Sequence, residues 1–141
     1  MTETISTQGL DVAISPAREG HAGAVKGADA MWLQRLRRTT RVALTQWRCT
    51  SLIDDAHVVV TELVTNALQH GDGEIRVLLR LTNSYLHVEV HDGSTACPVP
   101  RVSTPDDESG RGLLLVAAIA QDWGVEAGRS WCRLSFTRKS A

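Results

Sequence analysis

Several marks of large protein classes are absent from this sequence. Its three cysteines, Cys49, Cys97 and Cys132, are far apart, so no CxxC metal-binding pair exists, and the odd number argues against a closed disulfide framework. Lysine and arginine number 15 against 16 aspartates and glutamates, whereas nucleic-acid binders usually carry a basic surplus. We therefore expect neither a cysteine metal site nor direct binding to nucleic acid.

Long apolar runs are also missing. The longest, Leu113–Ala120, is far shorter than the about 20 residues that a membrane-spanning helix needs. The segment Met1–Val12 lacks the basic start and the apolar core of a signal peptide. We therefore expect a cytoplasmic protein without a membrane partner.

The remaining composition is that of an ordinary globular domain. With 141 residues, 43% of them hydrophobic and 22% charged, the chain can bury one core. Residues 1–10 are polar and aperiodic, which predicts a flexible tail before a single domain over residues 11–141.

The spacing of apolar residues predicts both helices and strands. A helical period marks three segments, about Ala28–Trp47, Asp54–His70 and Arg111–Gln121. A period of two marks Glu74–Thr82 and Leu86–Asp92, which we interpret as an antiparallel hairpin. Further strands are expected at Asp11–Ser15, Trp123–Ala127 and Ser130–Thr137. The predicted fold class is α+β, a two-layer sandwich with helices on one face of a mixed, mostly antiparallel sheet.

The second predicted helix carries a polar row. Glu62, Asn66 and His70 follow one another at intervals of four residues and therefore share one face, beside an apolar stripe. Asn66 offers a neutral oxygen suited to Mg²⁺, which takes few protein ligands, and Glu62 could accept a proton from a nucleophile. The alternative interpretation is the ordinary solvated face of an amphipathic helix.

Two short segments are suited to contacts with a nucleotide. Asp92 ends a predicted strand, where a carboxylate can accept a hydrogen bond from an exocyclic amine, and Gly93 allows close approach, although Asp-Gly is more often a plain turn. Ser109–Gly112 opens the third helix, where free N–H groups favour phosphate. Because the chain has neither a GxxxxGK[ST] P-loop nor a GxGxxG after a strand, a nucleotide site would need another architecture.

Other conspicuous residues favour structural interpretations. His87 and His91 share a strand face but lie about 13 Å apart, too far for one metal, so we interpret them as surface residues. A solvated face is favoured over a partner-docking patch for the arginines of the first helix, Arg35, Arg37, Arg38 and Arg41. Core or packing roles, rather than a stacking platform, are expected for the tryptophans, Trp32, Trp47, Trp123 and Trp131.

The order of these motifs resembles that of the GHKL, or Bergerat-fold, ATP-binding domain over roughly residues 30–137. Glu62–Gly71 looks like the N-box, Asp92–Ser94 like the first glycine box and Ser109–Leu113 like the second, beyond a loop that looks like the ATP lid. Gly128–Ser130 resembles the final box. The first box departs from the usual DxGxG, because serine, threonine and alanine follow Gly93. The TNA core with a trailing His-Gly is similar to the bacterial anti-sigma-factor serine kinases and their stand-alone actinobacterial relatives.

The resemblance implies ATP or ADP with Mg²⁺ between the lid and the N-box helix. Asn66 would hold Mg²⁺, Glu62 would orient or deprotonate the acceptor hydroxyl, and Asp92 would bind the adenine amine. Gly110, Arg111 and Gly112 would meet the phosphates. The other expected nucleotide contacts are His70, Gly93, Leu113 and Ser130. The lid, about Ser94–Ser109, is expected to be mobile without nucleotide.

Two functions follow as alternatives. One is a serine kinase that phosphorylates an anti-anti-sigma partner, and the other is a nucleotide-gated binding module that sequesters a sigma factor or another regulator without phosphorylating it. Glu62 favours the kinase, because pure binding would not need it. A histidine-kinase catalytic domain is disfavoured, because 141 residues leave no room for a phosphoacceptor helix pair. Pairing with a second copy to form a homodimer is a further expectation.

Overall fold

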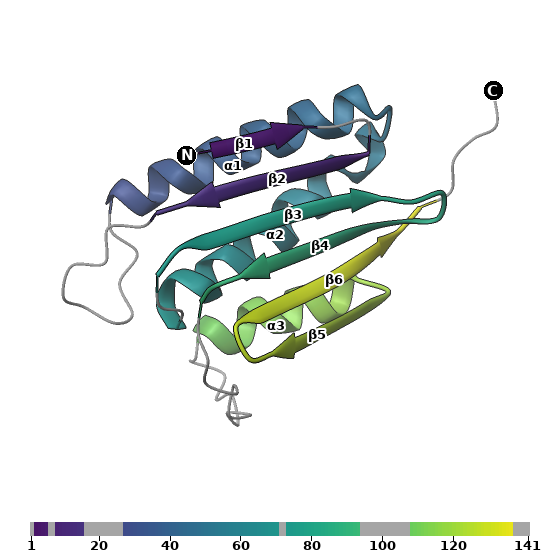
Figure 1. Cartoon of the computed structure of the whole chain (residues 1–141). Helices are drawn as coiled ribbons and strands as arrows, with labels where there is room; N and C mark the ends of the chain where they lie inside the picture. Colours follow the sequence, from purple (N-terminus) through teal and green to yellow (C-terminus); the bar gives the residue numbers. More distant parts are fainter. Residues whose placement is uncertain (1, 6–7, 16–26, 71–72, 94–107, 137–141) are drawn as a thin grey trace.

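The computed structural model describes residues 2–5, 8–15, 27–70, 73–93 and 108–136. In this part of the chain, a six-stranded sheet carries three α-helices on one face, and the other face is left open (Figure 1). This is the predicted α+β two-layer sandwich. We call the side of the sheet opposite the helices the open face.

The strands form one sheet in the order β1-β2-β3-β4-β6-β5. Their bounds are Thr2–Ile5 for β1, Gly9–Ile14 for β2, Ile75–Leu81 for β3, Tyr85–His91 for β4, Asp122–Glu126 for β5 and Arg129–Ser135 for β6. Every pair among these described strands is antiparallel, so the mixed character that was predicted does not appear in them.

The helical layer follows from three amphipathic segments. They are α1 (Gly27–Gln46), α2 (Ile53–His70, preceded by the 3₁₀ turn Thr50–Leu52) and α3 (Glu108–Ile119). The α2 helix contributes the densest apolar stripe to the core, with Val59, Val60, Leu63 and Val64 all at most 1% exposed. Since a stripe of this spacing must be covered, α2 packs across the centre of the sheet.

The predicted hairpin is confirmed as β3 and β4. Its alternation places Ile75, Val77 and Leu79 in the core, and the register sets Val77 opposite Val90 and Leu79 opposite Val88. The intervening residues of both strands therefore line the open face.

The described residues of the predicted tail, 2–5 and 8–10, include strand structure instead. Thr2–Ile5 forms the edge strand β1, which pairs antiparallel with β2 from Thr2 opposite Ala13 to Ile5 opposite Leu10. The strand predicted at Asp11–Ser15 accordingly begins earlier, at Gly9. An edge strand satisfies its backbone groups against a neighbour and needs little apolar periodicity of its own, which explains why the segment read as aperiodic.

The tryptophans divide between the core and more exposed positions. Trp47 is buried and Trp32 packs against the core, but Trp123 is 40% exposed and Trp131 lies on the open face. No helix in the described residues is long and apolar enough to cross a membrane. Of the cysteines, Cys49 and Cys132 are buried as free thiols, and burial raises the pKa of Cys132 to about 12.

Candidate functional site

The polar row of the second helix lies on α2, at the boundary between core and solvent. Glu62 and Asn66 are both partly exposed, one helical turn apart, whereas the adjacent Leu63 and Ala67 are buried. The buried stripe holds α2 against the sheet, so the two polar side chains are fixed at the rim of the helical layer. His70 ends α2, and its side chain lies outside the described residues.

The α3 helix closes over Glu62 at a glycine. A Cβ atom added to Gly112 would lie only 2.5 Å from Oε2 of Glu62, which is closer than real Cβ contacts. Gly112 is itself buried, in the first half of α3. The polar row of α2 and the glycine motif of α3, which are far apart in sequence, are therefore in contact. Because Gly112 has no side chain, the Glu62 carboxylate can occupy the space beside it.

This packing changes the acidity of Glu62. Burial raises the pKa of its carboxyl above the ordinary value of 4.5, because the charged form loses water. None of the hydrogen bonds and ion pairs found among the described residues joins Glu62 to a cation. A carboxylate with a raised pKa and no cation beside it is a better proton acceptor than an ordinary surface glutamate.

Asp92 lies directly after β4, in the position predicted for it. Its N–H donates a 3.0 Å hydrogen bond to the carbonyl of Gly128, which extends the pairing of β4 and β6 by one step. Val88 and Val90 face the core, so the alternation of β4 leads Asp92 to the helix-covered side. Gly93 follows with φ 75°, a conformation that side chains other than glycine rarely adopt.

Ser130 lies close to Asp92 in the sheet. It is 6% exposed, faces the core side of β6 and stands opposite Val90 of β4. Gly128, with φ 69°, makes the turn from β5 into β6 and accepts the hydrogen bond from Asp92. The final predicted motif therefore adjoins the first glycine motif through neighbouring strands.

These parts meet at one end of the molecule. Figure 1 shows the end of α2, the end of β4, the start of α3 and the β5–β6 turn on the same side of the two-layer sandwich. Segments far apart in sequence are thus gathered around the rim where Glu62 and Asn66 lie. Leu113 packs against the core there. Gly110 and Arg111 belong to α3, but the Arg111 side chain and the loop predicted to be a lid lie outside the described residues.

The oxygen ligands at this rim suit a cation that takes most of its ligands from water and from substrate phosphates. No group of three or more histidine, cysteine, aspartate or glutamate residues in the described part of the chain could hold a metal ion. Asn66 supplies one neutral oxygen at the rim, beside the Glu62 carboxylate. Mg²⁺ usually keeps several waters and takes one or two protein ligands together with substrate phosphates, which these residues fit.

Sequence reasoning missed a charged cluster on the open face. His87 and His91 both donate to the carboxylate of Glu89, at 3.0 Å each, and Arg129 binds the same carboxylate from β6. The Arg129 guanidinium holds the pKa of Glu89 down to about 2, with smaller contributions from the two histidines. The histidines were rightly placed on one strand face, but the residue between them was overlooked as their shared acceptor.

Comparison with known proteins adds one match. A family model described as "Histidine kinase-like ATPase domain" matches residues 28–136, a range that begins in α1, ends just after β6 and includes every site residue named above. No curated protein matches the chain.

Proposed function

The chain belongs to the histidine kinase-like ATPase domain family, and we propose that it is a serine kinase for a protein partner of the anti-anti-sigma type. The family supports an ATP-binding regulatory role. The observation that carries the finer proposal is the Glu62 carboxylate, held against Gly112 with a raised pKa and bound to no cationic side chain among the described ones. A domain that only binds nucleotide has no need of such a group.

The nucleotide would lie at the rim where α2, α3 and the ends of β4 and β6 meet. Asn66 would hold Mg²⁺, Asp92 would accept a hydrogen bond from the adenine amine, and Ser130 would assist near the adenine. Contacts with the phosphates would come from the start of α3, at Gly110, Arg111 and Gly112, because N–H groups at a helix start favour anions. The remaining nucleotide contacts in this proposal are His70, Gly93 and Leu113.

Bound with Mg²⁺, ATP supplies a phosphoryl group whose charge the ion helps to neutralise, and the protein supplies position. The partner's serine oxygen forms a bond to the γ-phosphorus while the bond to the β–γ bridging oxygen breaks and ADP leaves. The hydroxyl proton passes to the carboxylate of Glu62. The raised pKa of Glu62 favours this transfer, because an acceptor works best when its pKa approaches the working pH.

Phosphate transfer from radiolabelled ATP to candidate anti-anti-sigma partners tests the proposal. Glu62→Gln should lower the transfer rate by about 10²–10⁴-fold, the usual contribution of a general base, and should leave ATP affinity within a few-fold. Asn66→Ala should instead lose Mg²⁺-dependent nucleotide binding. Asp54→Asn, an exposed change on the first turn of the same helix, is the matched control and should retain both activities.

One outcome would replace the kinase by the second function. If the wild-type protein transfers no phosphate to any candidate but binds one of them only in the presence of nucleotide, the chain is a nucleotide-gated module that sequesters a regulator such as a sigma factor. Glu62 would then hold a water or serve packing.

A further inference from the structure

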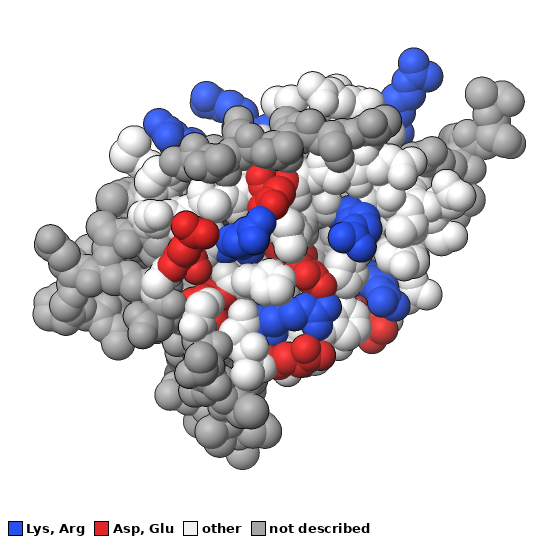
Figure 2. All heavy atoms as spheres, viewed as in Figure 1, with Lys and Arg blue, Asp and Glu red and all other residues white. Residues whose placement is uncertain are grey.

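The open face of the sheet is densely charged, with both signs interspersed (Figure 2). Its arginines are Arg76, Arg80, Arg129 and Arg133, and its acidic residues are Asp11, Glu89, Asp122 and Glu126. No helix covers this face in the described part of the chain (Figure 1). The nucleotide chemistry proposed above lies on the opposite side and leaves this face unused.

Most acidic groups on this face are already paired. The Arg76 guanidinium donates to Asp11 at 2.5 Å, and Arg129 binds both Glu89 and, at 2.9 Å, Glu126. Glu89 also accepts hydrogen bonds from the two neighbouring histidines. The carboxylates of the open face are therefore neutralised within the chain.

One row of basic side chains is only partly neutralised, because His87 donates to Glu89 and Arg133 has one long ion pair, of 4.0 Å, with Asp122. Arg80, His87 and Arg133 stand directly opposite one another on β3, β4 and β6. Arg80 is exposed and makes no hydrogen bond or ion pair with a described residue. Neighbouring strands are about 4.8 Å apart, so the two arginines of this row are separated by about 10 Å.

Arg133 lies against two aromatic rings and has one long ion pair. Its guanidinium lies 5.2 Å from the ring centre of Tyr85 and 5.4 Å from that of Trp131, and its Nε is buried without a hydrogen-bond partner. The nearest carboxylate, that of Asp122, is 4.0 Å away. His87 stacks on the same tryptophan. Arginine, tryptophan and tyrosine are the residue types that dominate binding energy at protein interfaces.

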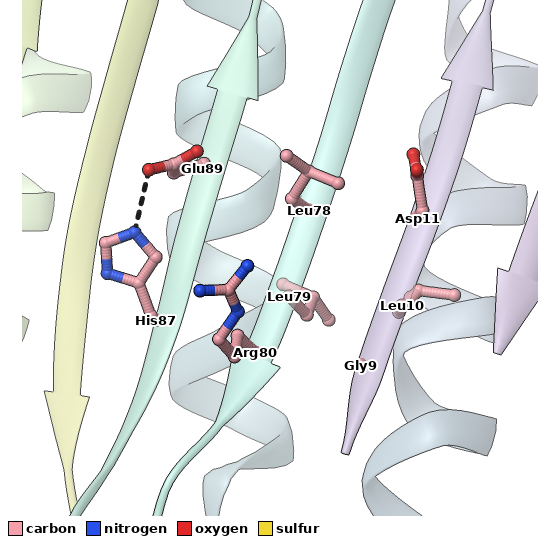
Figure 3. Close-up of a pocket in the computed structure, with 8 residues that line it drawn as sticks. All are labelled: Gly9, Leu10, Asp11, Leu78, Leu79, Arg80, His87 and Glu89. Carbon is pink, nitrogen blue, oxygen red and sulfur yellow. Dashed lines mark hydrogen bonds and ion pairs between the residues drawn. The ribbon is translucent and has the colours of Figure 1, made fainter. Parts of the chain in front are cut away.

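A depression of about 320 Å³ adjoins the row. Figure 3 shows Leu78 at its centre, between Glu89 and Asp11, with Arg80 and His87 along one side. Gly9, the cross-strand partner of Arg80, contributes no side chain, so the floor beside the free guanidinium stays open. The depression thus offers an apolar floor beside an unpaired positive charge.

We propose that the open face is a docking surface for an acidic segment of a protein partner. Two carboxylates about 10 Å apart, as at positions i and i+7 of a helix, would pair with Arg80 and Arg133. An apolar side chain on the flank of the same segment would cover Leu78, which lies two residues from Arg80 on β3. Charge-assisted hydrogen bonds from a guanidinium to a carboxylate are strong and directional, which suits a row of fixed arginines.

The charges around the row select this occupant over two others. A continuous phosphate chain needs a continuous run of cations, whereas this row offers two arginines about 10 Å apart, with His87 between them and Leu78 beside them, so a nucleic acid is disfavoured. A second copy of the chain would bring an open face on which Asp11, Glu89 and Glu126 are already paired. A partner with unpaired acidic residues meets neither obstacle.

The test uses the full chain and a synthetic helical peptide with glutamates at positions i and i+7 and leucine between them. A matched peptide with glutamines replaces those glutamates. We expect the acidic peptide to shift the amide resonances of β3, β4 and β6, to bind at least tenfold more tightly than the glutamine peptide and to weaken with salt.

Two single substitutions locate the site. Arg80→Gln should weaken binding of the acidic peptide by about three- to tenfold. Arg38→Gln, which makes the same charge change on the exposed side of α1, should alter it by less than twofold. Because the Arg80 guanidinium has no described partner, its loss should not change the unfolding temperature.

Several results would overturn the proposal. They are the absence of peptide binding, equal weakening by the two substitutions, tighter binding of a single-stranded oligonucleotide to the same face, or concentration-dependent self-association that Arg80→Gln abolishes. Because none of these measurements contains nucleotide, the outcome is independent of the kinase proposal.

Discussion

The two faces of the sheet treat a partly buried glutamate in opposite ways. On the helix-covered side, Glu62 lies against Gly112 and pairs with no cation in the described part of the chain, and burial raises the pKa of its carboxyl. On the open face, Glu89 is 18% exposed and bound by Arg129, His87 and His91, and its pKa falls to about 2. Both groups lose water, so the presence of a cation decides the direction of the shift.

The opposite pKa shifts suit the two carboxylates to different roles. Glu89 stays ionised at any ordinary pH and holds β4 to β6, so it is suited to structure. Glu62 has a stronger hold on a proton and lies at the rim where the family's motifs converge, so it is suited to proton transfer. The sheet thus separates the charged open face from the side on which we propose that the chemistry takes place.

The largest effect should come from closing the space around Glu62. In Gly112→Ala, the new Cβ would meet Oε2 at 2.5 Å and drive the carboxylate away, so we expect phosphate transfer to fall by about a hundredfold or more. Transfer assays with radiolabelled ATP measure the loss. The same substitution should leave the pKa of Glu89 at about 2, which NMR titration measures.

Gly112→Ala could also lower transfer by disturbing contacts with the phosphates. A double-mutant cycle with Glu62→Ala, measured as the free energy of unfolding, isolates the contact with Glu62 because it needs no nucleotide. Glycine to alanine within a helix ordinarily stabilises by about 0.5–1 kcal/mol. Gly112→Ala should therefore stabilise the Glu62→Ala variant more than the wild-type protein, in which the end of the Glu62 side chain must move aside. An equal effect in the two backgrounds would show that Glu62 does not occupy the space at Gly112.

A smaller effect is expected from removing the charge of Glu89. Glu89→Gln should lower the free energy of unfolding by about 1–3 kcal/mol at pH 7, because three donors lose a charged acceptor. The folded pKa is depressed from 4.5 to about 2, so this stability is present above pH 4.5 and is lost as the pH falls toward 2. Denaturant titrations from pH 7 to pH 2 should show the two proteins converging.

Glu126→Gln is the control for that prediction. Glu126 shares Arg129 with Glu89 but is 62% exposed, so its removal should cost well under 1 kcal/mol and change the acid transition little. Equal losses from the two substitutions would contradict the idea that the Glu89 cluster is the structural centre of the open face.

Much of this arrangement could be predicted from local patterns. Period-two alternation identified β3 and β4 with their buried valines, and spacing by four placed Glu62 and Asn66 on one helical face. The order of short motifs pointed to the domain family, which the match over residues 28–136 confirms. The edge strand β1 was not predicted, because it is held by backbone pairing, which the periodicity of side chains does not reveal.

The missing parts of the site depend on contacts between distant segments. The meeting of Glu62 with Gly112 requires α3 to lie against α2, and no local pattern specifies that approach. The Glu89 cluster likewise needs Arg129, forty residues away, to be in register with β4. Neither the specific anti-sigma role nor the partner follows from these contacts, and both stay proposals.

Calorimetric titration with Mg²⁺-ATP tests the account most directly. It compares variants of two carboxylates, Asp92 and Glu89, which are close in sequence but lie on opposite sides of the sheet. Asp92→Asn should lose about 1–3 kcal/mol of binding free energy, roughly five- to 150-fold in affinity, because the adenine amine loses its charged acceptor and faces a neutral amide instead. Glu89→Gln, three residues earlier on the open face, should bind within about twofold of the wild-type protein. Unchanged affinity in Asp92→Asn, or a loss in Glu89→Gln as large as in Asp92→Asn, would contradict the placement of the nucleotide on the helix-covered side.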